Sequence, residues 1–311
     1  MKAAIINQYG GTDAIEITSN HPAPKIGDHN VLVEVHAAGL NRIDSMIRAG
    51  YLQKMLPLQM PIVLAGDFSG KVIDLGVKVN DINVGDEVYG QAGVLLGGTG
   101  SLAEITAAPA NNVAKKPATL SMTEAAALPL VGSSAIQALE EHMKLQRKQK
   151  ILIHGGTGGI GSLSIQIAKH LGAYVATTVP GNDVALARTL GANEVIDYET
   201  ENFTSKIKDY DAVLVTAADA LAPSYGVLKK GGILVALAGQ VDDELAKNHG
   251  ITAISQMTKA SNEQLNRLTQ LVDEGKVKAV IDKTFGFSET KDAYNYFEQK
   301  NPKGKVVIRL K

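Results

Sequence analysis

One glycine-rich segment constrains the fold of this chain more than any other part of its sequence. Residues 151–161 read ILIHGGTGGIG and contain the spacing G-x-G-x-x-G, with Gly156, Gly158 and Gly161 as the three glycines. An apolar run typical of a buried strand precedes this spacing, and an amphipathic helical pattern follows it. Such glycines allow a tight turn, close approach of backbone N–H groups to a pyrophosphate, and close packing of the helix on the strand. The segment therefore predicts a dinucleotide-binding loop at the N-terminus of a helix. Its predicted cofactor contacts are Gly156, Thr157, Gly158, Gly159, Ile160 and Gly161.

The patterns on either side of this loop divide the chain into three regions. Before residue 121, short alternating runs such as Val31, Val33 and Val35 predict a β-rich region. From residue 150 onward, short apolar runs alternate with helical patterns, which is typical of a doubly wound parallel sheet with crossover helices. The capping box Ser121 to Glu124 marks a boundary between the two regions. The tail, from residue 276, returns to strand-like runs.

Composition excludes several classes of protein. The 311 residues carry a formal charge of −1, which provides no positive field for nucleic acid or an anionic membrane surface. Cysteine is absent, so a disulfide, a thiolate nucleophile and a cysteine-ligated metal are all excluded. The N-terminus lacks the apolar core of a secretory signal, and no run approaches the ~20 apolar residues of a membrane helix. We expect a cytoplasmic protein with no nucleic-acid or membrane partner.

The acidic residue expected after the second strand of the parallel sheet is displaced. Asp183 is the only acid near that position and lies slightly beyond it, so it is a candidate ribose ligand. A helix-capping role is the alternative. No Lys or Arg lies between Lys169 and Arg188 to bind a 2′-phosphate directly, so the residues leave NAD and NADP both open.

Several further segments, in their order and spacing, carry a resemblance to a known family. They read AAGLNRIDSMIRAGY at 37–51, AGDFSG at 65–70, VNDINVGDEVYG at 79–90, EAAALPLVGSSA at 124–135, LGANEVIDY at 190–198 and GKVVIRL at 304–310. With the glycine loop, the chain resembles the zinc-free, quinone-oxidoreductase-like branch of the medium-chain dehydrogenase/reductase family. The resemblance implies an α/β architecture with a Rossmann domain inserted in a β-rich GroES-like catalytic domain. We expect the catalytic domain at 1–121 and 276–311 and the Rossmann domain at 122–275.

The zinc ligands of the metal-dependent relatives are replaced here. The corresponding segments read Asn41-Arg42-Ile43-Asp44 and Gly66-Asp67-Phe68. His36 and His154 lie in apparent strands, where a packed or hydrogen-bonded role is commoner than metal ligation. We therefore expect no metal site.

By resemblance, Asn41, Asp44 and Tyr51 are the candidate catalytic residues. Asn41 could donate through its amide to a substrate carbonyl or hold the nicotinamide ribose, and Tyr51 could contact the carbonyl or donate a proton. The alternatives are that Asn41 shapes a turn, that Asp44 caps the following helix, and that Tyr51 only packs. Met46 stands where many relatives have Tyr, and for Asp67 a structural role is expected.

Four further residues are cofactor contacts by resemblance. Ser134 and the pair Ala238 and Gly239 are expected near the nicotinamide, and Tyr198 near the adenosine phosphate of relatives that use NADP. The resemblance favours NADP(H), while Asp183, where some relatives have Lys, keeps NAD(H) open. It also implies a homodimer.

Without a metal, a quinone or the C=C bond of an α,β-unsaturated carbonyl is an easier substrate than an alcohol, because each is already activated toward hydride. We therefore expect a zinc-independent reductase of these acceptors, using NADPH or NADH. The alternative is an NAD(P)H-binding sensor or structural protein with little catalysis. A metal-free alcohol dehydrogenase is the third hypothesis.

Overall fold

The computed structural model describes residues 1–55 and 57–311, which form two compact units. The first unit consists of Met1–Leu130, Ala260–Asp273 and Ala279–Lys311, and the second of Val131–Lys259 and Glu274–Lys278. Because both ends of the chain belong to the first unit, the second unit is an insertion in it.

The strands of the first unit pair antiparallel, except β15 and β16, which pair parallel, and its helices come from both ends of the chain. Its strands are β1 (Ala3–Ile6), β2 (Ile15–Thr18), β3 (Asn30–Gly39), β4 (Ile62–Val63), β5 (Asp67–Leu75), β6 (Glu87–Gln91), β7 (Ile105–Pro109), β8 (Val113–Lys115), β15 (Ile281–Gly286) and β16 (Lys305–Arg309). Its helices are α1 (Arg42–Arg48), α2 (Met122–Ala126), α9 (Asn262–Asp273) and α10 (Thr290–Gln299). The helix α3 (Pro129–Ile136) begins at the end of this unit.

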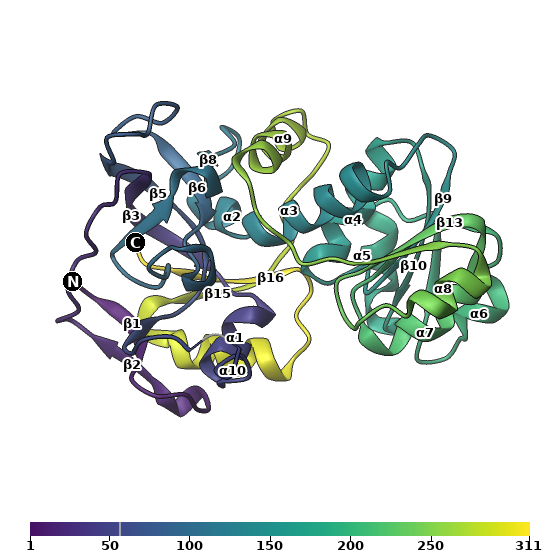
Figure 1. The fold of residues 1–311 in the computed structure, drawn as a ribbon, viewed down its shortest axis with the longest axis horizontal. Coiled ribbons are helices and arrows are strands. Elements are labelled where there is room, and N and C mark those ends of the chain that lie inside the picture. The colour runs from purple at the N-terminus through teal and green to yellow at the C-terminus, as the bar shows by residue number, and fades with distance from the viewer. Residues whose placement is uncertain (56) are drawn as a thin grey trace. The chain divides into compact units, whose positions relative to one another are not determined.

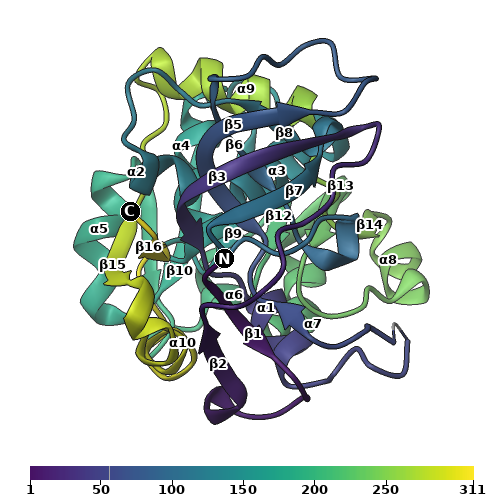
Figure 2. The same cartoon turned by 90° about the vertical axis from the view of Figure 1, so that its left-hand side faces the viewer.

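The larger sheet of this unit has the order β15-β16-β3-β5-β6-β8, with β7 also paired to β3. Val31, Val33 and Val35 of β3 are buried, as their alternation predicts. The tail rejoins this sheet, since β16 pairs antiparallel with β3 through Val307 and Gly39. In Figure 1 the yellow strands β15 and β16 accordingly lie beside the purple β3, and Figure 2 shows β3, β5, β6 and β8 side by side.

Helix α9 lies in a different unit from the one that its sequence position suggested. We expected residues up to 275 in the Rossmann domain, but α9 packs in the first unit. There the Tyr89 hydroxyl donates to the carbonyl of Leu265 at 2.7 Å, and the Thr119 hydroxyl donates to the Asp273 carboxylate at 3.0 Å. The apolar residues of α9, Leu268 among them, lie on one buried face of the helix. Their periodicity predicts that this face is buried, but not which unit it packs against.

The second unit contains a six-stranded parallel sheet. Its elements are β9 (Lys150–His154), α4 (Gly159–His170), β10 (Tyr174–Val179), α5 (Val184–Thr189), β11 (Glu194–Asp197), α6 (Phe203–Lys206), β12 (Tyr210–Val215), α7 (Leu221–Ser224), β13 (Leu228–Ala236), α8 (Asp243–His249) and β14 (Thr252–Ser255). The strand order is β11-β10-β9-β12-β13-β14, so the order reverses between β9 and β12. This confirms the doubly wound sheet, in which ligands bind beyond the carboxyl ends of the strands at the point of reversal.

None of the helices in the described part of the chain has the length and apolar character that crossing a bilayer requires.

Candidate functional site

The glycine loop joins the central strand β9 to α4, where the fingerprint predicts it. A Cβ atom on Gly156 would lie 2.0 Å from Oγ1 of Thr177, and one on Gly161 would lie 2.1 Å from the carbonyl oxygen of Gly155. A Cβ on Gly158, which precedes α4, would have its nearest contact at 3.4 Å, an ordinary van der Waals distance. Two glycines therefore permit close packing behind the loop, and the third leaves space at the helix N-terminus. The first N–H groups of a helix lack intrahelical acceptors, so this arrangement fits a dinucleotide phosphate.

The predicted cofactor residues of the second unit gather at the carboxyl edge of its sheet. Gly156 follows β9, Asp183 follows β10, Tyr198 follows β11, and Ala238 and Gly239 follow β13. Because all these strands are parallel, their carboxyl ends share one edge.

Asp183 is engaged with the glycine loop. The Thr157 hydroxyl donates to its carboxylate at 2.7 Å, and both side chains are buried. Asp183 directly precedes α5, but its side chain makes no capping hydrogen bond to that helix. Asp183 is thus the N-cap residue of α5, the position that the helix-capping alternative gives it, while its carboxylate accepts from Thr157. A ribose contact stays a prediction.

Tyr198 lies among acidic side chains. Partial burial raises the pKa of its phenol, and the negative charges of Glu199 and Asp183 raise it further, with smaller contributions from Asp219 and Asp197. The N–H of Gly181 also donates to the Glu199 carboxylate at 3.1 Å. The surroundings of Tyr198 therefore disfavour an additional negative charge.

Ser134 lies in α3 and meets two residues that the sequence analysis did not identify. Its hydroxyl is 2.8 Å from that of Thr258, and the side-chain amide of Gln256 donates to the Ser134 carbonyl at 3.1 Å and to Thr258 at 3.2 Å. Gln256 and Thr258 follow β14, so their position at the carboxyl end of a parallel strand was the signal that could have identified them.

His154 is a structural residue, as expected. Its Nδ1 lies 2.9 Å from the Thr178 hydroxyl, and its Nε2 lies 2.9 Å from the Ser224 hydroxyl. Ser224 donates its own hydrogen to the Ala220 carbonyl, so Nε2 of His154 carries the imidazole proton. Burial lowers the pKa of His154 to about 4, which keeps the ring neutral near pH 7.

In the first unit, Asn41 and Asp44 form the start of α1. Asn41 is the N-cap residue, and its backbone N–H donates to the Asp44 carboxylate at 2.8 Å. Asp44 therefore takes part in capping α1, which was the structural alternative for this residue. Burial raises the pKa of Asp44 to about 7; the negative charge of Asp67 adds to this, while the Asn41 N–H and the Lys305 charge oppose it. Asp44 therefore exchanges its proton near neutral pH.

Asp67 is the centre of a buried polar network. One carboxylate oxygen accepts from the side-chain amide of Gln91 and from the backbone N–H of Leu130, the latter at 3.0 Å. The other accepts from the Asn41 amide at 2.9 Å and from the Lys305 ammonium at 3.2 Å. The sequence analysis missed Gln91 and Lys305. For Lys305, the signal was a cation at the start of the apolar run KVVI.

Tyr51 does not join this buried set. Its side chain is 76% exposed. Tyr51 comes after the C-terminal end of α1, whereas Asn41 lies at the N-terminal end of that helix. Met46, in the same helix, is 39% exposed.

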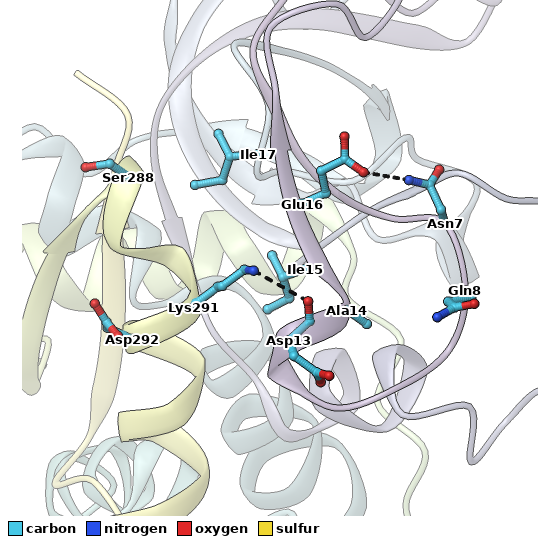
Figure 3. Close-up of a pocket in the computed structure, with 10 residues that line it drawn as sticks. All are labelled: Asn7, Gln8, Asp13, Ala14, Ile15, Glu16, Ile17, Ser288, Lys291 and Asp292. Carbon is cyan, nitrogen blue, oxygen red and sulfur yellow. Dashed lines mark hydrogen bonds between the residues drawn. The ribbon is translucent and has the colours of Figure 1, made fainter.

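A separate hollow of about 740 Å³ lies in the first unit between β2 and the start of α10. Figure 3 shows its lining, which contains none of the predicted site residues. Within the described ranges, no three His, Asp or Glu side chains are grouped as they would be to hold a metal ion.

The chain matches two family models. The model described as alcohol dehydrogenase GroES-like domain matches residues 27–118, and the model described as zinc-binding dehydrogenase matches residues 190–308.

Individual relatives match almost the whole chain. The 2-methylene-furan-3-one reductase of Solanum lycopersicum is 37% identical over 99% of this chain and 79% of its own length. The chloroplastic NADPH-dependent alkenal/one oxidoreductase of Arabidopsis thaliana is 35% identical with the same coverage. The solved structure of the quinone oxidoreductase from Coxiella burnetii is 33% identical, with a TM-score of 0.91, and covers 100% of this chain and 99% of that one. The similarity therefore includes both units.

Proposed function

We propose a reaction for this chain from the premise that it belongs to the medium-chain dehydrogenase/reductase family, among its quinone and enone oxidoreductases. The chain is accordingly an oxidoreductase. In the reaction, hydride passes from a reduced nicotinamide dinucleotide to a quinone or to the C=C bond of an α,β-unsaturated carbonyl. The observation that carries the proposal is the loop from Gly156 to Gly161, whose outer glycines have no room for a side chain.

The second unit would hold the cofactor. The start of α4 would bind its pyrophosphate through backbone N–H groups, and Ser134 would contact its nicotinamide. When bound, the dinucleotide supplies the hydride, and the protein binds and orients it. Two hydrogen bonds support these contacts: the Thr157 hydroxyl donates to the Asp183 carboxylate, and the Gln256 side-chain amide donates to the Ser134 carbonyl.

The first unit would act on the acceptor. Asn41 uses one hydrogen of its side-chain amide on Asp67, which leaves the other to bond the carbonyl oxygen of the acceptor. Such a donor stabilises the negative charge that develops on oxygen when hydride reaches the β-carbon. Asp44 sets the charge beside Asn41 by holding or releasing a proton near neutral pH. Water or the exposed Tyr51 phenol would then protonate the anion left by hydride addition, which completes the reduction.

The proposed reaction is independent of zinc. In the segments where metal-dependent relatives have ligands, this chain places the Lys305 ammonium within hydrogen-bonding distance of Asn41 and Asp67. A fixed cation there opposes binding of a divalent cation. Metal analysis of the purified protein, before and after chelator treatment with activity recorded, tests this. Loss of activity that zinc restores would overturn it.

For the hydride donor we propose NADPH, with NADH also accepted. The name of the Arabidopsis relative supports NADPH. The carboxylates around Tyr198 oppose the extra phosphate of NADPH. We therefore expect the preference for NADPH over NADH to be modest.

A binding titration followed by turnover tests the proposed function. The purified chain is titrated with NADPH and NADH by cofactor fluorescence, and a quinone and an enone are then added separately while NAD(P)H absorbance is followed. We expect saturable binding and acceptor-dependent oxidation. Tight binding with no turnover across a broad acceptor panel would instead support the sensor or structural alternative.

Two expectations from the sequence stay predictions. A cytoplasmic location is tested by fractionating the source cells, and a homodimer by light scattering of the purified chain. The location needs a direct measurement because the Arabidopsis relative is chloroplastic by name.

A further inference from the structure

We propose that Lys305 is a positioning residue for the reductase reaction, because its ammonium group fixes the Asn41 side-chain amide and draws electron density from it. The inference rests on the proposed function, in which that amide bonds the carbonyl oxygen of the acceptor. Lys305 opens β16 near the C-terminus, whereas Asn41 precedes α1 near the N-terminus.

The Lys305 ammonium has an oxygen for each of its three hydrogens. Nζ lies 2.6 Å from the Leu40 carbonyl oxygen, 2.5 Å from Oδ1 of Asn41 and 3.2 Å from Oδ2 of Asp67. The side chain is 4% exposed, so water competes little for these contacts. A lysine held in this way is a fixed charge rather than a mobile one.

This arrangement permits only one orientation of the Asn41 amide. Its oxygen accepts from Lys305, and its nitrogen donates to Asp67 at 2.9 Å. A 180° flip would place the amide nitrogen against the ammonium and the amide oxygen against the carboxylate. Both contacts would then be repulsive, so the second amide hydrogen has a fixed direction.

The charge on Lys305 also strengthens Asn41 as a donor. A cation bonded to the oxygen of a carboxamide withdraws electron density and makes its N–H groups more positive. The donor is therefore oriented and polarised before any substrate arrives, which is the requirement for effective stabilisation of a developing oxyanion.

Asp67 keeps the arrangement rigid without leaving an excess charge. Its carboxylate accepts four hydrogen bonds, from Gln91, Leu130, Asn41 and Lys305, and balances the charge of Lys305. A buried ion pair that is fully hydrogen-bonded in this way defines one geometry. Loss of only one partner leaves an unpaired buried charge.

The test compares Lys305→Met with two other variants of the full chain. Lys116→Met is the matched control: the Lys116 side chain is 7% exposed, and its ammonium donates to the carbonyls of Pro117 and Leu120 and pairs with the exposed Glu87 carboxylate at 3.3 Å. The double variant Asp67→Asn/Lys305→Met removes both charges of the buried pair, so that neither remains unpaired. Each variant is measured for thermal unfolding, for the Kd of NADPH, and for kcat and the KM of the acceptor.

For Lys305→Met we expect kcat to fall ~10- to 100-fold, below the ~100- to 1,000-fold that loss of a whole oxyanion donor costs. The Kd of NADPH should not change. The double variant should recover thermal stability but not kcat, and Lys116→Met should lose stability without losing kcat.

A double-mutant cycle identifies the route of the effect. If Lys305 acts through Asn41, adding Lys305→Met to Asn41→Ala lowers kcat little further, whereas independent effects would multiply. Two results would overturn the inference. One is recovery of both kcat and thermal stability in Asp67→Asn/Lys305→Met, and the other is a kcat loss in the Asn41→Ala/Lys305→Met variant equal to the product of the two single losses. A wild-type chain that turns over no quinone or enone would overturn the proposed function, and this inference with it. If the wild type is active and Lys305→Met has the same kcat, this inference is overturned while the proposed function stands.

Discussion

The Thr157 hydroxyl donates a hydrogen bond to the Asp183 carboxylate at 2.7 Å, and so joins the glycine loop to the turn after β10. Both side chains are buried, and Asp183 also contributes negative charge beside Tyr198. The contact therefore has two separable consequences, one for the position of the loop and one for the charge of the cofactor that the loop accepts.

Two substitutions of Asp183 separate these consequences. Asp183→Asn keeps an oxygen that can accept from Thr157 but removes the charge. We expect it to tighten NADPH binding relative to NADH by about 5-fold, the size of ~1 kcal/mol of electrostatic energy. Asp183→Ala also removes the acceptor, so both cofactors should bind more weakly. Fluorescence titrations measure the two Kd values, and an unchanged ratio in Asp183→Asn would show that this charge does not influence the 2′-phosphate.

Gly156 and Gly158 provide a matched pair for testing the loop. An alanine at 156 would place Cβ 2.0 Å from Oγ1 of Thr177, so the loop must move, whereas an alanine at 158 has its nearest contact at 3.4 Å. We expect Gly156→Ala to lower the melting temperature and to abolish measurable cofactor binding. Gly158→Ala should keep the wild-type melting temperature, so any loss of affinity there reports crowding of the phosphates alone. Normal NADPH binding by Gly156→Ala would contradict the assignment of the loop.

Features that depend on local periodicity were predictable from the sequence. The alternation of Val31, Val33 and Val35 and the strand, loop and helix around Gly156 each repeat within a few residues, so burial and element type follow from the pattern. The doubly wound sheet follows from the repetition of such units along the chain.

The missed features depend on contacts between distant residues. Lys305 and Asn41 are 264 positions apart, and nothing near either residue in the sequence indicates that they meet. Asp183 could be recognised as a polar residue at the start of a helix. That its carboxylate accepts from the Thr157 hydroxyl, and not from an N–H of α5, depends on where the glycine loop lies. Gln256 was overlooked because its role depends on which edge of the sheet β14 reaches.

Besides donating a proton, Tyr51 is expected from the sequence to be able to contact the acceptor carbonyl, and its exposure makes the test direct. Tyr51→Phe removes a hydroxyl from a side chain that is 76% exposed, so the melting temperature should stay unchanged. If the phenol bonds the acceptor, KM should rise by about 2- to 10-fold, the equivalent of one hydrogen bond of ~0.5–1.5 kcal/mol. Steady-state kinetics at saturating NADPH measure this. Wild-type KM and kcat in the variant would together remove Tyr51 from the site.

The Asp44 carboxyl predicts a pH dependence of stability with an unusual sign for an acidic residue. Its pKa is raised to about 7 by burial and by the charge of Asp67, against the Asn41 N–H and the Lys305 charge; Tyr294 also faces it. The folded chain therefore holds a proton that the unfolded chain releases near pH 4, and the free energy of unfolding falls as the pH rises from about 4 through about 7. Asp44→Asn keeps an oxygen to accept from the Asn41 N–H and cannot ionise. We expect the variant to gain stability over wild type by a few kcal/mol as the pH rises through this range.

Asp86 provides the contrast for this measurement. The Asn83 N–H and the Lys115 ammonium lower the pKa of Asp86, so its contribution is present at neutral pH and is lost as the pH falls through that lowered pKa. Asp86→Asn should therefore be less stable than wild type at pH 7, and the difference should vanish in acid. Thermal unfolding of the three chains is followed from about pH 2 to pH 8: the difference between Asp86→Asn and wild type should shrink below about pH 4, whereas the difference between Asp44→Asn and wild type should grow above it. A pH-independent difference between Asp44→Asn and wild type would mean that Asp44 does not titrate in this range, and a proton on Asp44 could then have no part in activity near neutral pH.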